Sequence, residues 1–137
     1  MILKTNKNKL YYEDGYHRET VAKSGTINGI DFAIVSYGTH PCCYVRVNKD
    51  SKFYGKNYDK ATNMICKIHC PYGLFTFARD KLFAFEDDKD KWILGWDYAH
   101  SGDYVVGINL YGEKHTKKEL FEEVVKVINA IKELEGE

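Results

Sequence analysis

The chain has 137 residues, of which 44% are hydrophobic and 15% aromatic, and its twenty basic and twenty acidic side chains sum to a formal net charge of zero. This length suits one packed domain, and the apolar fraction excludes wholesale disorder. Zero net charge argues against bulk electrostatic binding of nucleic acid, which needs a basic face. The apolar stretches, such as 32–35, are far shorter than the roughly 20 residues that cross a bilayer, so we expect no membrane partner.

The N-terminal segment, residues 1–4, lacks the apolar core and the cleavage site of a secretory signal. We therefore expect a cytoplasmic location. Because thiols stay reduced in that compartment, we interpret all the cysteines as free thiols. They are Cys42, Cys43, Cys66 and Cys70.

Residues 1–18 are polar and contain a turn signal, which predicts a loosely held arm or a peripheral hairpin. The turn dipeptide Asn-Gly at 28–29 precedes a segment, residues 30–37, whose first, third and fifth side chains are apolar. Side chains at that spacing fall on one face of a strand. The alternation therefore predicts a strand over 30–37.

A second strand is predicted over residues 42–47, because the Gly- and Pro-containing segment 38–41 turns the chain before it. The two strands would pair as an antiparallel hairpin, with His40 near their connection. A sheet edge beside 42–47 would then offer one route to a homo-oligomer.

The middle of the chain gives weaker patterns. Polar residues after position 47 predict a loop with one short helical turn near 58–64, and residues 64–69 and 73–78 have the composition of strands. The charge run at 86–91 is typical of a solvated hairpin connection. Residues 92–98 resume strand character.

The C-terminal segment has the clearest pattern in the chain. Thr116 and Glu119 have the spacing of a capping box. Apolar residues then recur at helical spacing, which predicts an amphipathic helix of about five turns over 116–135. They are Leu120, Val124, Val127, Ile128, Ile131 and Leu134. Packing this stripe on one face of the antiparallel sheet gives a single two-layer α+β domain spanning residues 1–137.

Polar residues capable of binding a ligand follow the predicted strands, where a rigid scaffold presents functional side chains. Asp97, His100 and Asp103 come at the end of the strand over 92–98, His40 follows an earlier strand, and His69 ends another. The sheet could bring the three histidines to one rim.

Three interpretations of these five residues compete. They could bind a divalent metal, since imidazole and carboxylate suit zinc, manganese or iron, although the D-x-x-H-x-x-D spacing matches no established ligand signature. They could instead line a polar pocket for a small ligand, with Tyr44, Tyr58 and Trp96 as aromatic walls. In the third interpretation they only tie down a loop through Asx turns and a His–carboxylate pair.

The sequence lacks a convincing zinc-knuckle, phosphate-loop or reactive-cysteine motif. Cys66-x-x-His69-Cys70 could be drawn as part of a zinc knuckle, but the chain has no C-x-x-C pair, and Cys42 and Cys43 would point to opposite faces of a strand. Neither glycine-rich phosphate loop occurs, and nothing marks one thiol as activated. We therefore predict no cofactor, no metal and no catalytic residue.

Four short segments carry a resemblance. They read H-x-C-x-Y-V from His40, Y-G-x-x-Y from Tyr54, G-L-F-T-F from Gly73 after His69, and G-W-D-x-A-H-x-G-D from Gly95. Their order is similar to that of small phage and prophage proteins whose segments read H-x-C-G-Y-V, Y-G-x-x-Y, H-G-G-L-T-Y and G-F-D-x-A-H-x-G-D. The chain departs from these at Cys43, where the group has glycine, and at 70–72, which interrupts the third segment. The resemblance implies a phage accessory protein in a bacterial host cell.

The leading hypothesis is a counter-defence protein that binds a small polar ligand without turning it over, sequestering a nucleotide-derived immune signal. The candidate ligand-binding residues are His40, Tyr44, Tyr58, His69, Trp96, Asp97, His100 and Asp103. One alternative is a metal-dependent hydrolase of a phosphoester or nucleotide. Another is an inhibitor of a host protein, in which the Tyr-rich N-terminal arm forms the interface.

Overall fold

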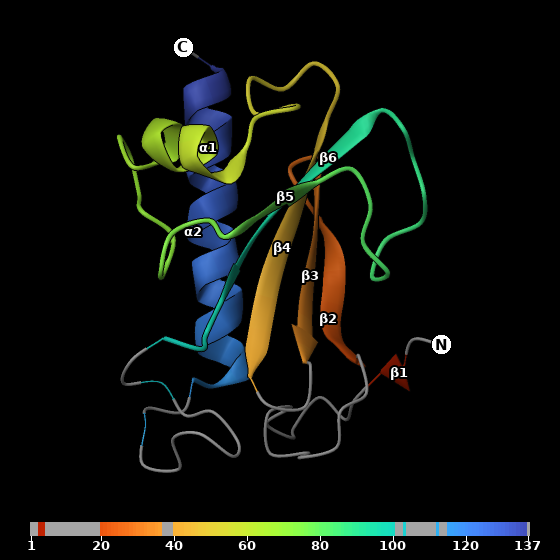
Figure 1. Cartoon of the computed structure of the whole chain (residues 1–137), viewed down its shortest axis with the longest axis vertical. Helices are drawn as coiled ribbons and strands as arrows, with labels where there is room; N and C mark the ends of the chain where they lie inside the picture. The colour runs from red at the N-terminus through yellow and green to blue at the C-terminus, as the bar shows by residue number, and fades with distance from the viewer. Residues whose placement is uncertain are drawn as a thin grey trace.

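The computed structural model describes residues 3–4, 20–36, 40–100, 103, 112 and 115–136 (Figure 1). It is an α+β domain, as predicted. Its elements in chain order are β1 (Leu3–Lys4), β2 (Thr20–Ile27), β3 (Ile30–Ser36), β4 (Pro41–Asn48), α1 (Tyr58–Ile65), β5 (Phe77–Arg79), β6 (Lys91–Asp97) and α2 (Lys117–Glu135).

The strands form one sheet in the order β1-β2-β3-β4-β6-β5. Among the strands that the structure describes, only β1 runs parallel to its neighbour, and the others pair antiparallel. The predicted hairpin over 30–37 and 42–47 is confirmed as β3 and β4, in which Ser36 pairs with Pro41. β4 also pairs with β6 on its other side. The expected sheet edge beside 42–47 is therefore wrong, because β4 lies inside the sheet.

Two strand predictions in the middle of the chain are also wrong. Residues 64–69 finish α1 and turn the chain, because Asn57 caps this helix and the helix buries Ala61 and Ile65 at a spacing of four residues. In the segment predicted over 73–78, Gly73 and Leu74 have positive φ angles, so the strand begins only at β5. The charged connection predicted over 86–91 lies between the antiparallel strands β5 and β6, but it ends at Asp90, because Lys91 is already the first residue of β6.

Two further N-terminal elements have no clear sequence signal. β2, residues 20–27, joins β3 through the Asn-Gly turn, although its own sequence mixes Lys, Ser and Gly with apolar residues. The arm predicted over 1–18 contributes the short β1 at residues 3–4, and the rest of it lies outside the described residues.

α2 covers one face of the sheet, as Figure 1 shows. Thr116 and Glu119 form the predicted capping box in full, each side chain accepting from the other's backbone N–H. The predicted apolar stripe is buried together with Ala130. It packs against side chains of β3 and β4 and against α1, and these residues make up the larger hydrophobic core. No helix in the described part of the chain is long and apolar enough to span a membrane.

The cysteines divide into two kinds. Cys42 and Cys43 are free and buried on opposite faces of β4, as predicted for adjacent strand residues. Cys66 and Cys70 form a disulfide, with their Cα atoms 4.2 Å apart. The expectation of four free thiols is therefore wrong for this pair. The disulfide forms because the turn that ends α1 brings the two cysteines within bonding reach.

Candidate functional site

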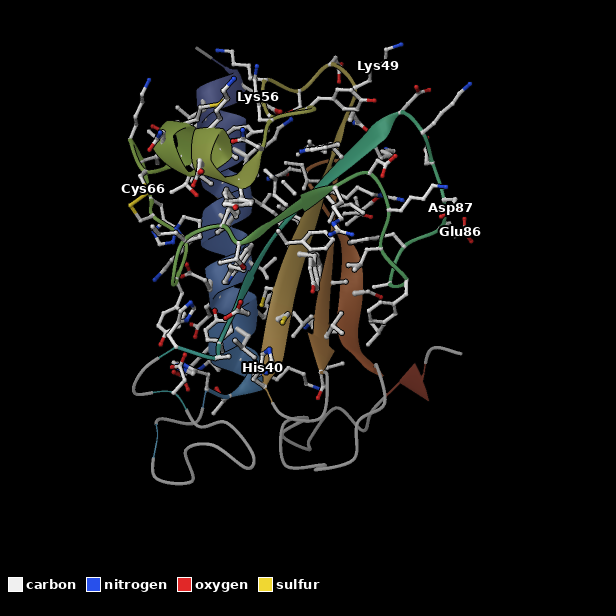
Figure 2. All side chains as sticks on the ribbon, viewed as in Figure 1. His40, Lys49, Lys56, Cys66, Glu86 and Asp87 are labelled. Carbon is white, nitrogen blue, oxygen red and sulfur yellow. A yellow bond between two sulfur atoms is a disulfide. The ribbon has the colours of Figure 1, made fainter. Side chains whose placement is uncertain are left out.

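Four of the five predicted polar residues, His40, Asp97, His100 and Asp103, gather where β4 begins and β6 ends. Cys42, the second residue of β4, pairs with Asp97, the last residue of β6. His40 directly precedes β4 and lies at the lower end of that strand in Figure 2. This register brings residues far apart in the sequence to one rim of the sheet.

Asp103 is the centre of this rim, with a side chain only 1% exposed. One of its oxygens accepts from the Tyr72 hydroxyl and lies 2.9 Å from Nε2 of His115. Its other oxygen accepts from the His100 backbone N–H at 2.9 Å. Burial raises the pKa of Asp103, but these hydrogen bonds outweigh it and hold the pKa below its ordinary value. Asp103 is therefore a buried, ionised carboxylate with its partners fixed.

The His100 ring lies between two carboxylates. Its Nε2 is 3.6 Å from Asp97 Oδ1, and its Nδ1 is 3.5 Å from Asp103 Oδ2. Gly73 packs against the ring so closely that a Cβ on this residue would come within 2.1 Å of it. A side chain at position 73 would therefore displace the imidazole. We call Tyr72, Asp97, His100, Asp103 and His115 the Asp103 cluster.

His40 belongs to the same electrostatic environment. Its pKa is lowered mainly by burial and also by the neighbouring His100, while the charges of Asp97 and Asp103 act in the opposite direction. His40 is therefore neutral near pH 7, and it becomes charged at a lower pH than an exposed histidine does.

A hollow of about 330 Å³ opens beside the Asp103 cluster. Tyr72 and Tyr98 stack in its wall with ring centroids 4.6 Å apart and planes 10° apart, and the His115 ring packs against both. The first turns of α2 supply further lining residues. The lining residues are Tyr72, Tyr98, His115, Glu119, Glu122, Glu123 and Lys126.

His69 does not join His40 and His100. Its Nε2 lies 2.8 Å from Oε2 of Glu123 on α2, and the same oxygen accepts from the Tyr72 backbone N–H at 3.1 Å. His69 therefore supports the wall of the hollow through Glu123.

The three predicted aromatic walls lie elsewhere. Trp96 is 1% exposed in the core under α2, where its Nε1 donates to the Tyr98 hydroxyl at 3.2 Å. Tyr44 is buried on the opposite face of the sheet, edge-on to Phe77. Tyr58 begins α1 and is 47% exposed. None of the three lines the hollow.

Sequence reasoning missed Tyr72, Tyr98, His115 and Glu123. One usable signal was present, because Glu119, Glu122 and Glu123 lie on one side of a well-predicted helix next to His115. Tyr72 had none, since its partner Asp103 is 31 residues away in sequence.

Within the described ranges, no group of three or more His, Cys, Asp or Glu side chains is arranged to hold a metal ion. Cys66 and Cys70, which the zinc-knuckle interpretation requires, are bonded to each other. No family model, no curated protein and no solved structure matches this chain.

Proposed function

We propose that the chain binds a small polar ligand in the hollow beside the Asp103 cluster. The observation that carries this proposal is a buried, ionised Asp103 that fixes Tyr72 and His115, two side chains that line the hollow. Polar groups held in place before a ligand arrives lose little entropy on binding. The cluster therefore favours recognition of one ligand geometry.

The charges of the lining favour one kind of ligand chemistry. Among the described lining residues there are three glutamates, one lysine, Lys126, and the imidazole of His115. Carboxylates accept hydrogen bonds from hydroxyl and amino groups, and they repel phosphates. Tyr72 and Tyr98 add an aromatic surface on which a planar group can pack. We propose a nucleoside-like or amino-bearing group inside the hollow, with any phosphate outside it.

The narrower role, sequestration of a nucleotide-derived immune signal by a phage protein, rests on the segment resemblance. The acidic lining of the hollow limits which part of such a signal could bind inside it. The base and sugar of such a signal would enter the hollow, since their hydroxyl and amino groups can donate to Glu119 and Glu122. This distinguishes the proposed ligand from free phosphate or an oligophosphate.

A thermal-shift panel tests the proposal. Adenosine, ADP-ribose, cyclic nucleotides and spermidine should include at least one compound that raises the melting temperature, since a ligand at 100 times its Kd stabilises by about 2.7 kcal/mol. Glu122→Gln should reduce that shift. Glu133→Gln, an exposed change near the far end of the same helix, should leave it unchanged and serves as the matched control.

Two outcomes would overturn this proposal. One is a flat response to every compound in the panel. The other is an equal loss in both variants, because a general effect of helix charge would then explain it. Stoichiometric metal in the purified protein, with loss of a phosphoesterase activity on chelation, would favour the metal-dependent hydrolase instead.

A further inference from the structure

The Cys66–Cys70 disulfide closes a short ring at the end of α1, and His69 lies inside that ring. Figure 2 shows the bond at the outer margin of the molecule, on the side of α1 away from the sheet. The backbone N–H groups of Ile68 and His69 both donate to the Ile65 carbonyl at 2.9 Å, which completes the turn. The disulfide therefore fixes the path of the chain directly after the helix.

The segment fixed in this way supplies one wall of the hollow. His69 contacts Glu123 from inside the ring. Tyr72, two residues after Cys70, donates its backbone N–H to Glu123 and its hydroxyl to Asp103. Every one of these contacts joins the segment to a lining or cluster residue that lies far away in the sequence.

This pair is also the accessible one among the cysteines. Cys70 is exposed and Cys66 is half-buried. Cys42 and Cys43 are buried, and burial raises the pKa of both thiols, that of Cys42 to about 12. Since the thiolate is the reactive form, exchange with a dissolved thiol or disulfide is confined to Cys66 and Cys70.

We propose that thiol–disulfide exchange at Cys66–Cys70 regulates the hollow, a role that rests on the proposed function of that site. With the bond formed, the segment 66–72 holds His69 and Tyr72 against Glu123 and Asp103. Reduction removes the ring and gives this segment more conformational freedom, because a cross-link restricts the chain it closes. The reduced form therefore binds the ligand more weakly.

A small thiol such as glutathione can reduce the disulfide in two exchange steps. One thiolate attacks a sulfur of the pair, which forms a mixed disulfide and releases the other cysteine as a thiolate. A second thiol then attacks the mixed disulfide, so the products are two cysteine thiols and one oxidised glutathione. Two electrons pass from the two glutathione molecules to the protein, and oxidised glutathione drives the reverse reaction.

Amide hydrogen exchange tests this device without any ligand. The amides of residues 67–70, 72 and 73 should exchange at least several-fold faster in dithiothreitol than in oxidised glutathione, whereas the amides of β3 and β4 should not change. Pro71 has no amide hydrogen. The double variant Cys66→Ser/Cys70→Ser should exchange like the reduced protein in both buffers. Cys42→Ala, a change on the far face of β4, should keep the full redox response and is the matched control.

Equal exchange of 67–73 in the two buffers would overturn the proposal, as would a redox response that survives in the double variant. A second measurement separates this device from the proposed function. The thermal-shift panel is repeated on both redox forms, and a smaller ligand shift in the reduced form supports regulation. If exchange changes but no compound in the panel binds either form, the proposed function fails while the disulfide still controls the segment.

Discussion

The two faces of the sheet are covered in different ways. α2 lays a continuous apolar stripe over one face and closes a large core that contains Trp96 and Cys43. On the other face, the buried cluster of the described residues consists of Ala33, Val35, Cys42, Tyr44 and Ile93, and the residues packed over them are partly buried ones from β5 and the β5–β6 connection. The apolar side chains of α2 are buried along the helix, whereas the aromatic side chains that cover the other face stay partly exposed. The Asp103 cluster and the hollow belong to the helix-covered side.

Each side also holds an acidic residue in hydrogen bonds, and the two differ in burial. Asp103 is 1% exposed among Tyr72 and His115. Asp31 on β3 accepts from Nε and Nη2 of Arg46 at 3.0 and 2.7 Å, and its side chain is 24% exposed. The helix-covered side therefore holds a buried charge, while the charge near the loop-covered face is partly solvated. Substitutions on the two faces test this contrast.

Truncating the helix-covered core should have the largest effect. Trp96→Ala removes a large, fully buried ring that packs against Phe75 and donates to Tyr98. We expect a loss of about 3–5 kcal/mol in the free energy of unfolding, measured by urea denaturation. A loss of less than about 1 kcal/mol would show that this face is no better packed than the other.

The next effect concerns the buried carboxylate. Asp103→Asn keeps the shape but removes the charge that accepts from Tyr72 and His115, so we expect a loss of about 2 kcal/mol near neutral pH. The pKa of Asp103 is lower in the folded state, so the unfolded state binds more protons as pH falls. Its stabilisation is present above the unfolded pKa, about 3.9, and is lost as pH falls through the folded value.

Urea titrations between neutral pH and pH 3 measure this dependence. The difference between the wild type and Asp103→Asn should shrink as the pH approaches the acid end. A difference that stays constant over the whole range would mean that the charge of Asp103 contributes nothing to stability.

The contrast between the faces also explains what the sequence could predict. Local signals mark the start of β3, its hairpin with β4, and α2: the Asn-Gly turn before β3, strand alternation, and the Thr116–Glu119 capping box. All three features are confirmed. β2 was missed because its apolar residues do not alternate cleanly. The turn after α1 was misread as a strand because a short apolar run does not distinguish the two.

The candidate site was predictable in the same limited way. Asp97 ends β6, and His100 and Asp103 follow it closely in sequence, so a local rule about strand ends predicts all three. Tyr72 and Glu123 meet this region only through tertiary packing, with His69 and Glu123 separated by 54 residues. Strand alternation places the aromatic rings of Tyr44 and Trp96 on particular faces of the sheet. The sequence does not say which face carries the site, so it could not decide whether these rings line it.

A smaller loss is expected on the loop-covered face. Phe85 is partly buried and packs over the smaller buried cluster, which contains Ala33 and Tyr44. The guanidinium of Arg46 lies 4.9 Å from the centre of the Phe85 ring. Phe85→Ala should cost about 1–2 kcal/mol, because only part of the ring's apolar area and one cation–π contact are lost. Urea denaturation of Phe85→Ala and Trp96→Ala side by side measures the ratio of their losses in the free energy of unfolding. Equal losses in the two variants would remove the distinction between the faces.

The smallest effect should come from the partly solvated ion pair. Asp31→Asn removes the charge that Arg46 and Thr26 contact, while Arg46 still donates to the Glu86 carbonyl at 2.7 Å. Burial raises the pKa of Asp31, but the hydrogen bonds from Thr26 and Arg46 and the Arg46 charge hold it below its ordinary value. We expect a loss of about 0.5–1 kcal/mol in dilute buffer.

Salt separates this ion pair from the buried carboxylate. Raising the salt concentration to about 1 M shortens the screening length to about 3 Å, so the loss caused by Asp31→Asn should shrink. The loss caused by Asp103→Asn should persist, because solvent ions do not reach a carboxylate that is 1% exposed. A double-mutant cycle of Asp31→Asn with Arg46→Gln isolates the pairwise coupling. A coupling that is as large and as insensitive to salt as the effect at Asp103 would show that loop cover protects a charge as well as helix cover does.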